Sequence, residues 1–321
     1  MSNISMMPLH TFELSIIITA EEYQNCRNIL YAVAKEMNVQ CFDENGWLNF
    51  RGFRSVGVSL SMCKNKERPG AVVRLQVNPS TLLGNTAPTE LFLPTKKRLK
   101  NIVRSLRVLL RAISFPREVE DFSLHRLDIC KDVRLEKQEH LVEYLRLFRR
   151  GANRSHWTEE RFGDERDDHS VRRKRDDYKV TMYDKVFELS QPNRSKHSPE
   201  PFEWHESYHI LRIETALLRP GIREQMQRLK IDYDLRWPDL LMELCLSGSS
   251  IMEDLIDKLM PNGTFYSLNT ARIVVQMAGL RTDMQENLID FLRNTNRYSY
   301  LDASKIKMVK NRKKRTRQLY E

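Results

Sequence analysis

The sequence predicts an α+β protein in which an antiparallel sheet packs against helices and an α-helical C-terminal domain follows. Several stretches alternate apolar with polar residues, as half-buried strands do, and others repeat apolar residues at helical spacing. From about residue 232 the pattern is helical throughout. We therefore predict an α+β domain over residues 1–230, a helical domain over 231–300 and a basic tail over 301–321.

The N-terminal elements follow from alternation and capping. Residues 11–18 predict a strand, and Thr19, followed by two glutamates, predicts the start of an amphipathic helix. Residues 55–63 and 71–78 alternate again around a turn-like segment, which predicts a hairpin with Arg74 on its polar face.

A helix starting after Thr95 has an apolar stripe and a basic opposite face. Such a face is often simply solvated. With 53 Lys and Arg against 43 Asp and Glu, a net charge of +10, a polyanionic partner is favoured, nucleic acid first and an anionic membrane surface second. From the hairpin and this helix we select as DNA contacts Arg74, Lys97, Lys100 and Arg104.

Residues 150–177 form a predicted charged loop. Acidic and basic residues are too dense there for a hydrophobic core, so we expect a mobile loop or an extended hairpin that clamps an anionic strand. Two basic clusters are further candidate DNA contacts: Arg172, Arg173, Lys174 and Arg175 in this loop, and Lys313, Lys314 and Arg315 in the tail.

Three predicted strands carry polar side chains on one face and apolar side chains on the other. A solvated sheet face gives the same alternation, but charges within apolar strands cost desolvation energy unless they are paired or used. The three sets are Arg126 with Asp128 in 124–130, Tyr183 with Lys185 in 178–188, and Arg212 with Glu214 in 210–216.

If these strands are neighbours in one sheet, their side chains match phosphoryl transfer on DNA. Asp128 and Glu214 offer carboxylate oxygens suited to a divalent cation, Mg²⁺ or Mn²⁺. Tyr183 offers a phenolic nucleophile, and three cations stabilise the charge on the phosphate: Lys185, Arg126 and Arg212. The alternative is that Tyr183 is a packed aromatic beside Lys185.

Three segments, 124–133, 181–189 and 211–219, resemble in order and spacing the Arg-x-Asp, Tyr-x-Lys-x-x-Glu and Arg-x-Glu blocks of rolling-circle replication initiators. The likeness is to the filamentous-phage gene II and plasmid Rep trans type, and it covers about the middle third of the chain. It implies a replication-initiator-like fold and adds Glu188 to the metal ligands. It also leaves Tyr178 as the alternate nucleophile.

The resemblance implies metal-dependent, site-specific nicking and rejoining of DNA through a 5′-phosphotyrosyl intermediate. The expected substrate is a single-stranded or cruciform replication origin of a phage or plasmid, with a host helicase as a further partner, in the cytoplasm of a bacterial host. One feature departs from the better-known initiators: the chain has no His-x-His metal motif, so a carboxylate-type site is needed.

The alternative from a different class is a noncatalytic, sequence-specific DNA-binding regulator or plasmid or phage maintenance protein, with a helix-turn-helix in the C-terminal helices. RNA binding is disfavoured because the polar strand faces carry charges rather than base-stacking aromatics. No apolar run approaches the roughly 18 residues that a membrane span needs, so no span is expected, and the expected partner is DNA rather than a membrane. The five cysteines are spaced for neither a disulfide framework nor a zinc site.

Overall fold

The computed structural model describes residues 6–64, 69–85, 91–151, 157–160, 169–190, 209–259, 273 and 275–297. Its strands are β1 (Leu9–Ile18), β2 (Cys41–Glu44), β3 (Trp47–Phe50), β4 (Val58–Lys64), β5 (Ala71–Val77), β6 (Ser123–Leu135), β7 (Thr158–Glu160), β8 (Ser170–Lys174), β9 (Tyr178–Asp184) and β10 (His209–Leu218). They form one antiparallel sheet in the order β2-β3-β4-β5-β1-β6-β10-β9-β8-β7.

The described helices are α1 (Ala20–Glu36), α2 (Pro79–Leu82), α3 (Lys96–Ala112), α4 (Gln138–Gly151), α5 (Lys185–Ser190), α6 (Arg219–Leu229), α7 (Trp237–Leu246), α8 (Gly248–Leu259) and α10 (Thr282–Arg297). Two predicted starts are confirmed by their caps. The Thr19 hydroxyl accepts from the Glu22 amide in a capping box, and the Thr95 hydroxyl accepts from the Arg98 amide. The predicted sheet packed against helices is therefore confirmed.

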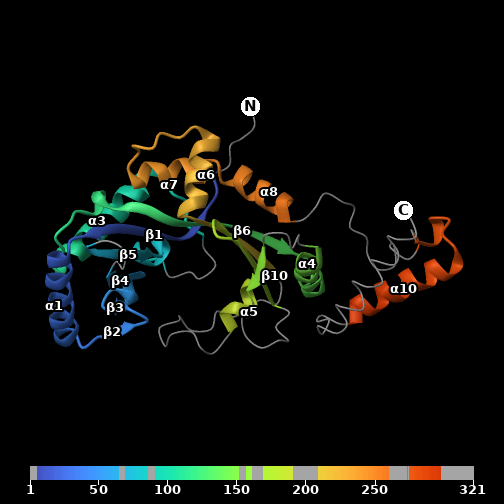
Figure 1. Cartoon of the computed structure of the whole chain (residues 1–321), viewed down its shortest axis with the longest axis horizontal. Coiled ribbons are helices and arrows are strands. Elements are labelled where there is room, and N and C mark those ends of the chain that lie inside the picture. The colour runs from blue at the N-terminus through green and yellow to red at the C-terminus, as the bar shows by residue number, and fades with distance from the viewer. Residues whose placement is uncertain are drawn as a thin grey trace. The chain divides into compact units, whose positions relative to one another are not determined.

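The apolar strand face carries the core because every second side chain points to it. The indole ring of Trp237 in α7 stacks on Phe12 of β1, with ring centroids 5.5 Å apart. Tyr178 of β9 is fully buried and donates its hydroxyl to the Gly221 carbonyl of α6, over 3.3 Å. Figure 1 shows α6, α7 and α8 together along one side of the sheet.

The sheet consists of two halves with the same topology. Each half is a strand, a helix and then a run of four strands, the last of which pairs with the first. The first half runs β1-α1-β2-β3-β4-β5, and the second runs β6-α4-β7-β8-β9-β10 with α5 inserted before β10. Antiparallel pairing of β1 with β6 joins the halves at the centre of the sheet.

Two predicted elements differ in detail. The strand predicted over 178–188 is too long, because β9 ends at Asp184 and Lys185 begins α5. The Asp184 carboxylate accepts from the Phe187 amide over 3.0 Å and so caps the new helix. In the charged stretch 150–177, the described strands β7 and β8 pair with each other at the edge of the sheet. This pairing agrees with the extended hairpin, one of the two predicted forms of this stretch. Residues 161–168, between the two strands, lie outside the described residues.

The described residues up to Leu259 belong to one compact unit, and α10 belongs to a second. Helices α7 and α8 lie in the first unit, where Gly248 sits against the side chains of Met7 and Ile129. The division at residue 230 and the helical C-terminal domain stay predictions, and the basic tail lies outside the described residues. Among those residues, no helix is long and apolar enough to cross a membrane.

Candidate functional site

The three charged strands are neighbours, in the order β6-β10-β9. Directly paired residues share a sheet face. Across the two pairings, Glu214 lies opposite Cys130, and Arg212 lies opposite both Asp132 and Tyr183. One polar face therefore carries five predicted site residues: Arg126, Asp128, Arg212, Glu214 and Tyr183.

Tyr183 and Glu214 form the central contact of this face. The Tyr183 hydroxyl donates to Glu214 Oε1 over 2.6 Å, and His10 Nδ1 lies 3.2 Å from the same oxygen. Only 8 % of Tyr183 is exposed. Burial, together with the Glu214 carboxylate, raises the pKa of Tyr183 above its usual value, so the phenol is protonated and Glu214 is placed to receive its proton.

Asp128 is buried beside two hydrogen-bond donors. Arg126 Nε donates to Asp128 Oδ1 over 2.7 Å, and the Thr11 hydroxyl of β1 donates to Oδ2. Burial raises the pKa of Asp128, and the Arg126 guanidinium opposes that shift. Burial likewise raises the pKa of Glu13, the acid next along the polar face of β1.

Arg212 is committed to a partner that the sequence analysis did not identify. Its guanidinium is bidentate on Asp132 of β6, with Nε to Oδ1 at 2.6 Å and Nη2 to Oδ2 at 2.7 Å. Only 1 % of the Arg212 side chain is exposed. Burial lowers the pKa of Arg212, but the hydrogen bonds and charge of Asp132 outweigh the effect of burial and hold that pKa above its ordinary value. Arg212 is therefore held in a buried ion pair, and its contact with phosphate stays a prediction.

Lys185 and Glu188 lie in a helix rather than in the expected strand, whereas Tyr178 faces away from Tyr183, as strand alternation predicts. Lys185 is buried in α5, where Nζ donates to Glu188 Oε2 over 2.6 Å and lies 5.8 Å from the Tyr183 ring centroid. Tyr178 faces the apolar side, where Gln225 donates to its hydroxyl over 2.6 Å. Burial raises the pKa of Tyr178, and the residue lies away from the polar face.

The predicted metal ligands do not fit a metal ion as they are arranged. Thr11 and Arg126 engage Asp128, Tyr183 engages Glu214, and Lys185 engages Glu188. In the part of the chain that the structure describes, no three His, Cys, Asp or Glu side chains gather as a group that could hold a metal.

Apart from Arg74, the predicted DNA contacts fall into three groups. The α3 residues Lys97, Lys100 and Arg104 are exposed. The basic residues 172–175 are instead paired with acids of the same region: Arg172 with Glu160 at 3.3 Å, Arg173 with Glu159 at 3.0 Å, Lys174 with Glu160 at 3.0 Å and Arg175 with Asp177 at 2.6 Å. The third group, Lys313, Lys314 and Arg315, lies outside the described residues.

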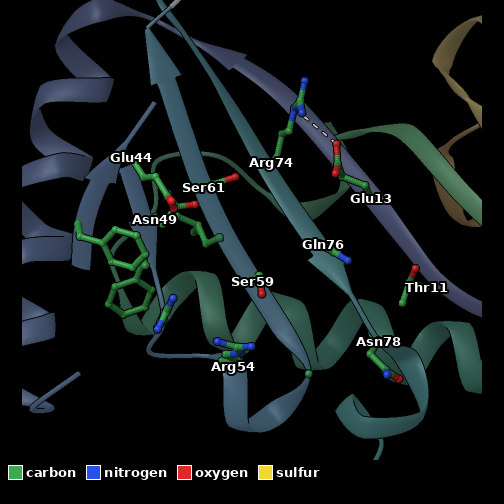
Figure 2. Close-up of a pocket in the computed structure, with 15 residues that line it drawn as sticks. Thr11, Glu13, Glu44, Asn49, Arg54, Ser59, Ser61, Arg74, Gln76 and Asn78 are labelled. Carbon is green, nitrogen blue, oxygen red and sulfur yellow. Dashed lines mark ion pairs between the residues drawn. The ribbon is translucent and has the colours of Figure 1, made fainter. Parts of the chain in front are cut away.

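A hollow of about 510 Å³ lies on the polar face of the first half (Figure 2). Arg74 of β5 lines it, with Nε 3.5 Å from Glu13 Oε1. Thr11 also lines the hollow while donating to Asp128, so the hollow adjoins the charged cluster. Alternation placed Gln76 and Asn78 on one face with Arg74, but the hollow itself was not predicted, because hydroxyls and amides alternating along a strand look like an ordinary solvated face. The polar lining residues of this kind are Asn49, Ser59, Ser61, Gln76 and Asn78.

Comparison with known proteins identifies no family for this chain. No protein-family model matches it, and no curated protein matches it significantly.

Proposed function

We propose that this protein nicks and rejoins single-stranded DNA as a rolling-circle replication initiator, with Tyr183 as the nucleophile. One observation carries the proposal: the Tyr183 hydroxyl donates to the Glu214 carboxylate over 2.6 Å. A nucleophile hydrogen-bonded to a base is the arrangement that covalent catalysis requires. The same face holds Arg126 and Asp128, and the net charge of +10 suits a polyanionic substrate.

The chemistry follows from this pair. Because the raised pKa keeps Tyr183 protonated, attack requires a base, and Glu214 takes the phenolic proton as the oxygen attacks phosphorus. The bond from phosphorus to O3′ breaks, and the leaving oxygen takes up a proton from water to become a 3′-hydroxyl. The 5′ phosphate stays on Tyr183 until a 3′-hydroxyl attacks it; that hydroxyl loses its proton to water, and Tyr183 recovers its own proton from Glu214. Arg126 supplies positive charge on the same face.

Access and metal dependence are part of the proposal. Because only 8 % of Tyr183 is exposed, the reaction requires a rearrangement that exposes its hydroxyl. Dependence on Mg²⁺ or Mn²⁺ stays a prediction, and the steps above use only protein groups. In this proposal the sheet, with α7 and α8 in the same compact unit, is a replication-initiator-like nicking domain. The helical C-terminal domain over 231–300 stays a prediction.

The test is formation of a covalent adduct. We expect the full chain, incubated with labelled single-stranded DNA from its own replicon and Mg²⁺, Mn²⁺ or a chelator, to give a denaturant-resistant protein–DNA adduct. Tyr183→Phe should abolish it, whereas Tyr144→Phe, at a half-exposed tyrosine on α4, should not. Glu214→Gln should slow adduct formation by about 10²-fold or more. An adduct that persists in Tyr183→Phe would assign the nucleophile elsewhere.

A noncatalytic DNA-binding regulator is the second candidate, and one observation favours it. The charged groups of β6, β9 and β10 are satisfied by one another, as in Arg212 with Asp132. This candidate predicts DNA binding with no adduct under any metal. Salt-sensitive affinity does not separate the two candidates, since both predict it.

A further inference from the structure

The shared topology of the two halves gives each residue of the Tyr183 cluster a counterpart in the first half. The last residue of β1, Ile18, corresponds to the last residue of β6, Leu135, because a helix follows each strand. With these two strands aligned, the strand pairings fix the other strands of both halves. The matched residues are Ser15 with Asp132, Arg74 with Arg212, Gln76 with Glu214, Ser59 with Thr181 and Ser61 with Tyr183.

The first half has an arginine at the position of Arg212, but it has neither the tyrosine nor the glutamate of the Tyr183 cluster. Ser61 stands where the second half has Tyr183, and Gln76 stands where it has Glu214. An amide does not act as a base as a carboxylate does. Both residues line the hollow, so this half offers hydrogen bonds at the positions where the other half offers a phenol and its proton acceptor.

The arginine differs in its availability. Arg212 is locked to Asp132, but the counterpart of Asp132 is Ser15, which has no charge to neutralise Arg74. Arg74 has one ion pair with a described residue, a longer contact of 3.5 Å with Glu13, and its guanidinium lies over the Trp47 ring at 4.5 Å from the centroid; its side chain is 36 % exposed. Its guanidinium can therefore bind an additional anion, which the buried guanidinium of Arg212 cannot do without leaving Asp132.

The rest of the lining is mixed: Glu13 and Glu44 contribute carboxylates, but most of the other polar side chains are arginines, hydroxyls and amides, which can contact phosphates and hydrogen-bonding groups. Arg54 is exposed at the hollow and makes no ion pair with a described residue. Ser59 and Gln76 lie opposite each other on β4 and β5, and both are exposed. Figure 2 shows Asn49 and Asn78 at separate places around them. Pockets for small ligands are mostly apolar, whereas amides and arginines bind base edges and phosphates.

We propose that the hollow is a second nucleic-acid site, which holds a single-stranded DNA segment without cutting it. Arg74 and Arg54 contact phosphates, and Gln76 and Asn49 contact base edges. Because Thr11 lies in the hollow and also contacts Asp128, a strand held there extends toward the Tyr183 cluster. The choice of DNA as ligand rests on the proposed function, but binding in the hollow does not require that Tyr183 react.

The test replaces Gln76 by glutamate, the residue that its counterpart Glu214 has in the second half. Gln76→Glu places a carboxylate among the proposed contacts and should weaken binding of a fluorescent single-stranded oligonucleotide about tenfold, measured by anisotropy in a chelator so that nothing is cleaved. Gln24→Glu makes the same change of net charge at an exposed position on α1 and should stay within about twofold of wild type. Equal affinities of the two variants would overturn the proposal.

A second measurement needs no variant and covers the case in which Gln76→Glu fails to fold. Hydrogen exchange of the wild-type chain, with and without the oligonucleotide, should show added protection in β4 and β5; no protection there would overturn the proposal. Adduct formation with unprotected β4 and β5 would reject the hollow and keep the nickase. Protection of β4 and β5 without any adduct would keep the hollow as a DNA-binding site and reject the nickase.

Discussion

Arg212 shows that a charged side chain within an apolar strand can be structural even when its spacing matches a catalytic block. Alternation correctly predicted that Arg212 and Glu214 share a face, because the side-chain period of a strand is two. The partner of Arg212, Asp132, is 80 residues distant in sequence, and the pairing of β6 with β10 brings the two together. The same holds for Thr11 and Asp128, which lie 117 residues apart. A single strand's pattern does not contain such pairings.

The buried ion pair gives a prediction about stability. Arg212→Met removes the guanidinium and leaves Asp132 without its bidentate partner, so the free energy of unfolding should fall by about 3 kcal/mol or more. Denaturant unfolding monitored by far-UV circular dichroism measures this. Arg27→Met is the matched control, because Arg27 pairs with Asp43 at the surface and its loss should leave stability close to wild type. Equal effects of the two variants would show that the Arg212 pair contributes no special stability.

At the scale of elements, helix starts with side-chain caps were predictable, and the end of β9 was not. Thr19 and Thr95 precede regular amphipathic patterns, so the position of each cap was clear. After Asp184, Lys185 and Val186 continue the alternation of polar and apolar residues even though α5 has begun. A helix as short as α5 shows too few apolar positions for its period to be distinguished from that of a strand.

The contact between α6 and β9 gives the prediction at this scale. Gly221 approaches β9 so closely that an added Cβ would lie 2.4 Å from the Asp177 carbonyl oxygen and 2.9 Å from Tyr178 Cε1. Gly221→Ala should therefore push α6 from the sheet and lower the free energy of unfolding by about 1–3 kcal/mol. Arg223→Ala, at an exposed position of the same helix, should change it by no more than about 0.5 kcal/mol. Thermal and denaturant unfolding of both variants measure the difference, and a neutral Gly221→Ala would refute the close contact.

At the scale of the whole sheet, the sequence supported an antiparallel sheet with packed helices but not its two-half plan. The plan depends on β1 pairing with β6, and on each half's last strand returning beside its first. The halves also differ where their counterparts can be compared, as in Ser61 against Tyr183 and Gln76 against Glu214. A topology that repeats with different side chains leaves no periodic signal in the sequence.

This plan predicts how protection from exchange is distributed. Strands β1 and β6 are paired on both sides and lie in the middle of the sheet, whereas β2 and β7 are edge strands of 4 and 3 residues. Native-state hydrogen exchange of the full chain should therefore be slowest in peptides from β1 and β6, because opening them requires separation of the two halves. Peptides from β2 and β7 should exchange fastest among the strands, because an edge opens without disturbing the core. Exchange in β6 as fast as in β7 would mean that the halves separate readily, and that β1 and β6 do not hold the hollow and the Tyr183 cluster in a fixed relation.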